Sequence, residues 1–260
     1  MMKEYFEADI KKDAISHARE KYPEECCGLI VNDKYIALEN IATDNINSFK
    51  IDSSVLIHYE DDIKAVVHSH CDDDNLPEAG HASKKDMIQQ VALGIPFGII
   101  HLNKYGNYMK DFWWGDQLPV QDLVGRPFVH GVYDCYSLLR DYLRNKGVVI
   151  PIYPRDNYFW EVYKHQDDAT HNPENIVLGN VNDINVNHPE LGTFIEIDAK
   201  DLQEGDFIAA QMKAKVVNHC AVYIGNGLVL HHLYNKLSRR EPKNSWNKYW
   251  TNYFRYMEVV

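Results

Sequence analysis

Apolar side chains follow two patterns along this chain, and each pattern predicts a different kind of element. A spacing of three or four residues, which gathers side chains on one helical face, occurs over residues 8–22, 83–93 and 135–143. Short apolar runs bounded by turn residues are typical of strands. They cover residues 28–31, 34–38, 63–67 and 97–102, and then 207–211, 216–224 and 228–232. Helices and strands mix in both halves, so the pattern predicts an α+β or α/β protein.

The chain is long enough for two domains, and its composition changes near the middle. At 260 residues, two domains of about 130 residues each are the natural expectation. A stretch that includes Pro119, Gly125 and Pro127 has the composition of a linker. We therefore predict a first domain over residues 1–115, a linker over 116–127 and a second domain over 128–260. Residues 151–198 show little periodicity, which predicts a long irregular insertion, and the aromatic segment 246–256 is expected to pack on the second sheet.

Charge and cysteine content narrow the classes of partner and compartment. The formal net charge is −11, which argues against a nucleic-acid partner on electrostatic grounds. No apolar run is long enough to span a membrane, and the N-terminus lacks the apolar core of a signal peptide. Five cysteines without the spacing of a disulfide scaffold are typical of a reducing compartment. We expect a protein that is made in the cytosol and has no membrane-spanning segment.

A candidate nucleophile, Cys135, stands at the predicted start of the helix over 135–143. Asp134 occupies the position of an N-cap residue. The sulfur would then lie near unpaired backbone N–H groups at the positive end of the helix dipole, which lowers the pKa of a thiol and favours the nucleophilic thiolate. The alternative is that Cys135 is a small buried hydrophobic residue.

Two histidines downstream are candidates for the base that such a thiol needs. His219 and His231 are twelve residues apart, in two strand-like runs joined by Gly225-Asn226-Gly227. A tight hairpin at this turn would bring the two runs side by side. A cysteine, a histidine and an orienting polar group form the usual set of nucleophile, base and orienter. The alternative is that both histidines are surface residues.

These residues also carry a family resemblance. Asp134-Cys135-Tyr136-Ser137-Leu138, followed by the sequences 202–208 and 219–227 with a histidine twelve residues after His219, resembles the NlpC-type cell-wall peptidases over about residues 118–260. The resemblance implies a papain-like α+β domain with an antiparallel sheet that cuts peptide cross-bridges of bacterial peptidoglycan. It makes Cys135 the nucleophile, His219 the base and His231 the orienter. Phe128 stands where many members carry a tyrosine.

A candidate metal site lies in the first half. His68 and His70 follow a predicted strand and are two residues apart, so both rings point to the same side. Ser83 is the expected N-cap of the helix over 83–93, and Asp86 lies in its first turn. Two histidines and a carboxylate suit zinc and leave a fourth coordination position open, as in catalytic rather than structural sites. Glu25 is a candidate proton acceptor there. The alternative is a surface loop with chance histidines.

The same residues resemble the JAMM (MPN-type) metalloproteases over about residues 1–115. The resemblance implies a mixed sheet with flanking helices, zinc bound by His68, His70 and Asp86, and catalysis by Glu25 and Ser83. The gap between the second histidine and the serine is about five residues longer than the family norm. The longer gap adds further possible ligands, namely Cys71, Asp72 and His81. A rival geometry, in which Cys71 closes the zinc site as a fourth ligand, therefore stays open.

The order of the two halves resembles the tail-tip assembly proteins of long-tailed phages. This resemblance implies a virion protein of the tail tip, assembled in the host cytoplasm beside other tail-tip proteins, that digests the cell wall during passage of the genome into the cell. Two alternatives remain open. One is a cellular isopeptidase or amidase with the same two domains. The other is a structural tail component whose sites have decayed.

Overall fold

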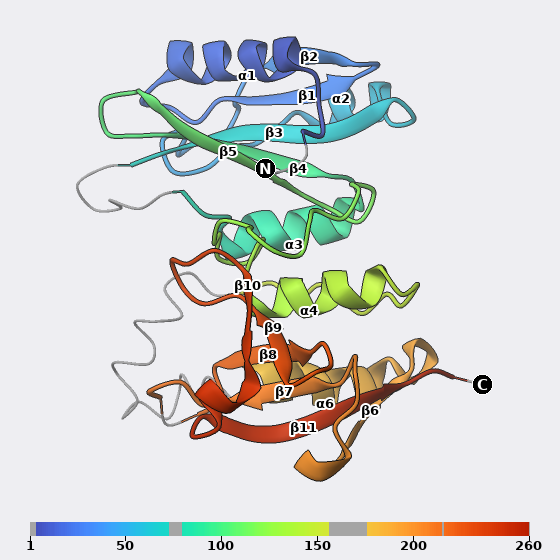
Figure 1. The fold of residues 1–260 in the computed structure, drawn as a ribbon. Helices are drawn as coiled ribbons and strands as arrows, with labels where there is room; N and C mark the ends of the chain where they lie inside the picture. Colours follow the sequence, from blue (N-terminus) through green and yellow to red (C-terminus); the bar gives the residue numbers. More distant parts are fainter. Residues whose placement is uncertain (1–3, 73–79, 156–175, 215, 260) are drawn as a thin grey trace. The chain divides into compact units, whose positions relative to one another are not determined.

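The computed structural model describes residues 4–72, 80–155, 176–214 and 216–259, and the chain divides into two compact units. The first unit runs to Pro119 and the second begins at Val120. Each unit has its own sheet (Figure 1). Each also has its own apolar core. The structure places residues 120–127, part of the expected linker, in the second unit.

The first unit is built on a five-stranded mixed sheet in the order β2-β1-β3-β4-β5. Its strands are β1 Cys27–Val31, β2 Lys34–Leu38, β3 Ile63–Cys71, β4 Phe97–Leu102 and β5 Tyr108–Trp114. Only the pair β3 and β4 is parallel. Strand β3 is longer than the sequence predicts, because it continues through His68 and His70 to Cys71. Both histidines therefore have the regular alternation of a strand, which places their side chains on one face.

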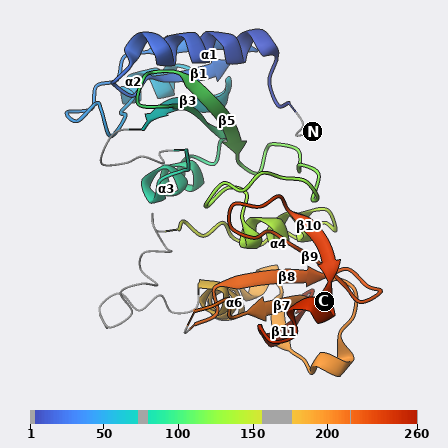
Figure 2. The same ribbon diagram turned by 60° about the vertical axis from the view of Figure 1, so that its left-hand side comes forward.

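Two of the first unit's helices lie on opposite faces of this sheet (Figures 1 and 2). The helices of this unit are α1 Ala8–Lys21, α2 Ser53–His58 and α3 Lys84–Leu93. The buried residues Ile10, Ala14 and Ala18 of α1 join an apolar cluster with Ala65 and Val67 of β3. Since Val66, His68 and His70 alternate with these β3 residues, they point to the opposite face. The histidines are thereby directed away from the α1 cluster.

The second unit is built on a six-stranded antiparallel sheet in the order β10-β9-β8-β7-β11-β6. Its strands are β6 Thr193–Glu196, β7 Phe207–Ala210, β8 His219–Tyr223, β9 Leu228–His231, β10 Arg239–Pro242 and β11 Trp250–Met257. The aromatic C-terminal segment does pack on this sheet. It forms β11, which pairs with β7 on one side and β6 on the other.

The second unit's core forms between helix α4 Cys135–Arg144 and the sheet, with helix α6 Ile176–Asn187 packed into the same cluster. The α4 residues Leu138, Leu139 and Tyr142 are buried in it. They lie on one face because they are separated by one, three and four positions. Short 3₁₀ turns complete the unit at η2 Pro189–Leu191, η3 Ala199–Asp201 and η4 Lys243–Trp246.

One sequence prediction about this unit is wrong. Residues 151–198 are not an irregular insertion throughout, because α6 and β6 fall within them. Val177, Val181 and Ile184 of α6 and Phe194 of β6 are buried in the core. The helical spacing of the three α6 residues was obscured because asparagine and glycine, both poor helix formers, occupy many positions between them. Residues 156–175 of the predicted insertion lie outside the described residues.

A buried arginine ties the start of the second unit to α4. The Arg126 side chain is 1% exposed, and its guanidinium donates to the backbone carbonyls of Gln121 and Asp122 and to the Asp141 carboxylate on α4. The Arg126 backbone N–H donates to Ser238 Oγ at 2.9 Å. These contacts hold residues 121–126 against the helix that carries Cys135.

Among the helices in the described ranges, none has the length and apolar character needed to cross a membrane.

Candidate functional site

Cys135 is the first residue of α4, and Asp134 is its N-cap, as the sequence predicts. The Asp134 carboxylate accepts from the Ser137 backbone N–H at 2.9 Å and from the Gly131 N–H at 3.1 Å. The first N–H groups of a helix have no carbonyl partner within it. The Cys135 sulfur therefore lies at the electropositive end of α4, and the capped first turn keeps that end ordered.

The cap residue is itself held by a buried ion pair that the sequence did not reveal. Arg155 Nε lies 2.7 Å from Asp134 Oδ2, and Arg155 Nη2 donates to Asp134 Oδ1 at 2.9 Å. Both side chains are buried. Burial raises the pKa of Asp134, but the charges of Arg155 and His130 and the bonds from Ser137 outweigh it and leave that pKa below its ordinary value. The N-cap is thus an ionised carboxylate.

The two predicted histidines meet across a hairpin. Strands β8 and β9 pair antiparallel with Ala221 opposite His231, and the turn uses a left-handed Asn226 between two glycines with positive φ. His219 lies two residues before Ala221, so it is the diagonal neighbour of His231 on the same face. His219 Nε2 and His231 Nδ1 are 3.2 Å apart. Both rings are buried.

The thiol of Cys135 contacts His219 and also a second thiol. The side-chain hydrogen bond from Cys220 and the hydrogen bond and charge of His219 hold the pKa of Cys135 well below its ordinary value, against the opposing effect of burial. Burial raises the pKa of Cys220 well above its ordinary value. Cys220 therefore stays protonated and donates a hydrogen bond to the Cys135 sulfur. Cys220 directly follows His219 in the sequence, yet no local pattern marks it as a thiolate partner.

A cavity of about 560 Å³ opens beside Cys135 and His219. Phe128, Met212 and Tyr234 form apolar parts of its wall. The Phe128 ring contacts His232 edge-on, with ring centroids 5.4 Å apart. Phe128 therefore lines the site, although its ring carries no hydroxyl to donate there. A mostly apolar cavity with the reactive groups at one end suits a peptide or another small ligand.

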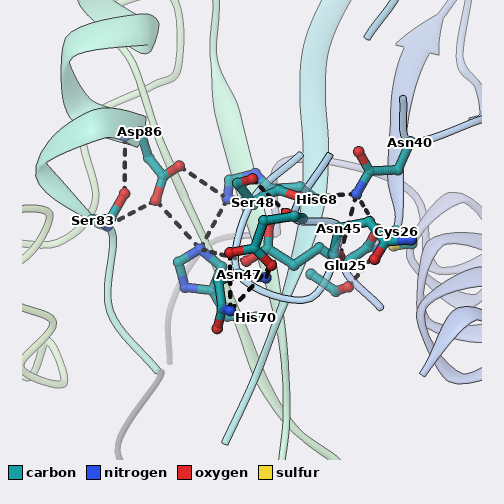
Figure 3. Close-up of polar contacts among 12 residues, drawn as sticks. Glu25, Cys26, Asn40, Asn45, Asn47, Ser48, His68, His70, Ser83 and Asp86 are labelled. Carbon is teal, nitrogen blue, oxygen red and sulfur yellow. Dashed lines mark hydrogen bonds and ion pairs between the residues drawn. The ribbon is translucent and has the colours of Figure 1, made fainter. Parts of the chain in front are cut away.

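In the first unit, the structure brings His68, His70 and Asp86 together (Figure 3). The two Nε2 atoms are 3.1 Å apart, and the Asp86 oxygens lie 3.4 Å from His68 Nε2 and 3.3 Å from His70 Nε2. Among the described residues, this is the group of histidine, cysteine and acidic side chains that could hold a metal ion. Around zinc bound at roughly 2.0–2.1 Å, tetrahedral ligands are ~3.4 Å apart. The donor types and spacings therefore fit zinc.

The protonation states of these groups match those of metal ligands. Burial lowers the pKa of His68, so its ring is neutral. Burial opposes ionisation of Asp86, but its contacts with the rings of His68 and His70, which include hydrogen bonds, hold its pKa well below the ordinary value. Burial raises the pKa of Glu25 to about 7, and Glu25 Oε1 lies 3.8 Å from His70 Nε2. Neutral imidazole and carboxylate are the forms that bind metal.

Ser83 is the N-cap of α3, as predicted, and forms a capping box with Asp86. The Asp86 N–H donates to Ser83 Oγ at 3.1 Å, and the Ser83 N–H donates to Asp86 Oδ2 at 2.8 Å. Capping therefore fixes Asp86 in position as well as ending the helix. The Ser83 hydroxyl stands beside the cluster with its own proton free of this bond.

The other possible ligands lie outside the group. Cys71 packs against the α1 cluster, on the opposite face of β3 from His70, because adjacent strand residues alternate. Asp72 Oδ1 lies 2.8 Å from His101 Nε2. His81 is buried but does not belong to the metal-binding group. Among the described residues, Cys71 is therefore not placed to act as the fourth ligand of the rival geometry.

Sequence reasoning missed the loop that supports Glu25. The Asn40 amide donates to the carbonyls of Glu25 and Ser48 at 2.9 and 3.0 Å, and Figure 3 shows Asn40 close to Glu25. Phe49 of the same loop stacks on the His68 ring, with centroids 4.3 Å apart. A lone asparagine in a polar stretch has no sequence signature for this role.

The family model of the NlpC/P60 family matches residues 125–256. The chain belongs to the NlpC/P60 family. The match covers the second unit, with Cys135, His219 and His231 inside it. The matched region also contains the antiparallel sheet and the start of α4 described above. The resemblance of residues 1–115 to the JAMM metalloproteases stays a prediction, because the match begins after that region.

Two phage proteins are similar over most of the chain. Tail tip assembly protein K of Escherichia phage N15 is 30% identical over 256 residues, which cover 95% of this chain and 92% of the relative. The protein of the same name from Escherichia phage lambda is 28% identical over 180 residues, 69% of this chain and 74% of the relative. Among solved structures, NlpC2 from Trichomonas vaginalis is 23% identical over 51% of this chain and 42% of its own, with a TM-score of 0.34.

Proposed function

We propose that this chain is a phage tail protein whose NlpC/P60 unit is a cysteine peptidase that cuts peptide cross-bridges of bacterial peptidoglycan. The observation that carries the proposal is the contact between Cys135, at the capped start of α4, and His219. The family match and the apolar cavity beside these groups support the same chemistry. A lowered thiol pKa supplies the thiolate that attacks an amide carbonyl.

The arrangement suits the two steps of amide cleavage by a thiol. The Cys135 thiolate attacks the carbonyl carbon, and the carbon–nitrogen bond breaks as His219 gives a proton to the leaving amine. Water then attacks the thioester, with His219 accepting its proton, and releases the carboxylate and the thiol. Backbone N–H groups of the first turn of α4 are available as donors for the oxyanion.

We infer that the protein acts at the tail tip, beside other tail-tip proteins, and that wall cleavage serves passage of the genome into the cell. The support is the match to two proteins named tail tip assembly protein K, one of them over 95% of this chain. The tail-tip role covers both units, because that match covers both. A cellular isopeptidase has no such support.

The first prediction tests the nucleophile. Purified peptidoglycan is incubated with the full chain, and the released fragments are identified by mass, which names the bond that is cut. Cys135→Ser should reduce cleavage by at least about 10³-fold, since members of a catalytic unit act together. Cys71→Ser is the matched control, because this partly buried thiol lies in the first unit. Full activity in Cys135→Ser, or none in the unaltered chain, would contradict the proposal.

The metal-binding group favours a second site, and we propose that His68, His70 and Asp86 hold a zinc ion. A bound zinc would act as a Lewis acid toward a carbonyl group. Glu25 lies beside His70 as a proton acceptor, and the Ser83 hydroxyl is placed to donate to a developing oxyanion. The resemblance to JAMM metalloproteases points to a peptide or isopeptide bond as the target.

The second prediction tests the zinc ion. Elemental analysis of the full chain, supplied with zinc and desalted, should give one zinc per chain. His70→Ala should lose it, and a chelator should lower the melting temperature of the first unit but not of the second, since bound metal stabilises only the unit that holds it. His101→Ala, on the neighbouring strand opposite His70, should keep the zinc. A chain without zinc, or one whose zinc survives His70→Ala, contradicts the site and favours a decayed one.

A further inference from the structure

Glu241 on β10 continues the line of polar groups that begins at Cys135. Strand β10 pairs with β9 so that Arg239 lies opposite His231 and Glu241 opposite Val229. Glu241 is therefore the diagonal neighbour of His231, as His219 is on the other side. His231 Nε2 lies 3.1 Å from Glu241 Oε2. The groups of β8, β9 and β10 thus form an unbroken series from the thiol to a carboxylate.

The carboxylate is held in place by a second donor. Trp246 Nε1 donates to Glu241 Oε2 at 2.6 Å, and the Trp246 ring stands edge-on to His231 with centroids 5.2 Å apart. Arg239 Nε lies 2.7 Å from Glu241 Oε1. Glu241 is 23% exposed at its side chain, whereas the His231 ring is fully buried. The Glu241 oxygen that faces His231 is therefore held by two ring N–H groups, those of His231 and Trp246.

These contacts determine which nitrogen of each ring carries hydrogen. A carboxylate only accepts, so His231 must donate through Nε2. Burial lowers the pKa of His231 to about 4, so near neutral pH the ring has a single N–H and its Nδ1 is an acceptor. His219 must then donate to that Nδ1 through its own Nε2. The remaining nitrogen of His219, Nδ1, is left to exchange a proton with Cys135.

We propose that Glu241 is a positioning residue of the thiol peptidase, which fixes the tautomers of His231 and His219 and strengthens the cationic form of His219 through its negative charge. The proposal rests on the proposed function of the NlpC/P60 unit. It adds a fourth member, on a fourth element, to the nucleophile, base and orienter. The logic is that of an orienting carboxylate behind a catalytic histidine.

The sign of the pH effect follows from the groups around the two rings. His231 faces His219 from β8 and Arg239 and Glu241 from β10. His219 faces the Cys135 thiol, with Asp134 and its partner Arg155 beside that thiol. Removing the negative charge of Glu241, while Arg239 stays, makes the net charge near the two histidines more positive. This change opposes positive charge beside the Cys135 thiolate, so the alkaline limb of Cys135 alkylation should move to lower pH.

The test compares Glu241→Ala and Glu241→Gln with a matched control, Arg240→Gln. Arg240 is exposed and neighbours Glu241 on β10, so its side chain points to the other face. Peptidoglycan cleavage by the full chain gives kcat. The rate of Cys135 alkylation by iodoacetate, followed by mass across pH, gives a readout that needs no substrate. Iodoacetate is anionic, so its rate falls when the neighbouring imidazolium loses its proton.

Glu241→Ala should lower kcat by about 10- to 100-fold, as expected on removal of a partner that orients a functional histidine. In this variant, the alkaline limb of the alkylation profile, where the rate falls as the pH rises, should lie at a pH lower by roughly half a unit. Glu241→Gln keeps an acceptor oxygen for His231 and Trp246, so it should recover most of kcat but retain the lowered limb. Arg240→Gln should change neither. If Glu241→Ala does not fold, the pH of the alkaline limb in Glu241→Gln alone tests the proposal.

An alkaline limb that is unchanged in both Glu241 variants overturns the proposal, even if kcat falls, because a purely structural loss would not move it. The alkylation profile also separates this proposal from the peptidase assignment. A chain that fails to cut peptidoglycan, yet shows the shifted limb in Glu241→Gln, contradicts the substrate assignment and supports the role of Glu241. A chain that cuts peptidoglycan but shows an unshifted limb supports the peptidase assignment and contradicts the role of Glu241.

Discussion

The Cys135 thiol has two polar neighbours, Cys220 and His219, and each favours the thiolate in a different way. Cys220 stays protonated and donates a hydrogen bond to Cys135, whereas His219 is the group proposed to exchange a proton with this thiol. A hydrogen-bond donor and a cation both favour the thiolate, and together they outweigh burial, which disfavours any charge. The Cys135 thiolate is therefore stabilised by contacts within the folded unit as well as by its place at the start of a helix.

The third prediction ranks the two histidines. His219→Ala removes the group that moves the proton, so activity should fall by about 10²- to 10⁴-fold. His231→Ala removes only the ring that orients it, so the loss should be smaller, about 10- to 100-fold. Peptidoglycan cleavage by the full chain measures both. A larger loss in His231→Ala than in His219→Ala would reverse the two roles.

At the scale of elements, the start of α4 is held by an ion pair that also fixes the nucleophile. Asp134 caps the helix and pairs with Arg155, and neither charge is exposed to water. A buried pair adds little stability over an apolar pair of the same shape, but removing one partner leaves a buried charge alone. The geometry of the site and the stability of the second unit are therefore linked through Asp134.

The fourth prediction follows from this pair. Asp134→Asn should destabilise the second unit by about 3 kcal/mol near neutral pH, because the Arg155 charge is then buried without a partner. The pKa of Asp134 is lower in the folded unit than its ordinary value of 3.8. Its stabilising contribution is therefore complete above about pH 4 and is lost as the pH falls through the folded pKa.

Urea unfolding of the full chain at several pH values provides the measurement. The gap in unfolding free energy between the unaltered chain and Asp134→Asn should narrow as the pH falls below about 4 and through the lower folded pKa of Asp134, where the unaltered chain also comes to carry a neutral group at this position. The double variant Asp134→Asn with Arg155→Met should recover part of the loss near neutral pH. A gap that is independent of pH would show that the Asp134 charge does not carry the effect.

At the scale of the whole molecule, the chain consists of two units with separate sheets and separate apolar clusters. The cysteine site lies wholly in the second and the metal-binding group wholly in the first. Each site is therefore assembled within one core and does not require residues from the other unit. The two sites can therefore be tested separately, by variants confined to one unit.

The fifth prediction tests this independence. Fragments 1–119 and 120–260, divided where the structure divides the chain, should each fold and melt in one cooperative transition. The division must precede Gln121, because Arg126 binds its carbonyl and ties it to α4. Circular dichroism against temperature measures both fragments. An unfolded fragment 120–260 would show that the second unit needs the first.

Much of the fold was predictable from the chain because it depends on local pattern. Apolar runs bounded by turn residues marked most strands, and helical spacing marked the helix that begins at Cys135. The N-caps Asp134 and Ser83 were predictable because a cap is a contact between residues three apart. The hairpin that joins His219 to His231 followed from its glycine turn.

The tertiary structure decided what depends on contacts between distant residues. Helix α6 and strand β6 are stabilised by burial in the core, which outweighs poor helix propensity. Arg155 and Glu241 are two among many charged residues, and only chain packing and strand register select them as the partners of Asp134 and His231. A register shift of one residue would turn Glu241 to the other face. The sequence by itself therefore determined the candidate reactive groups, whereas chain packing and the register of the strands decided which charged residues contact them.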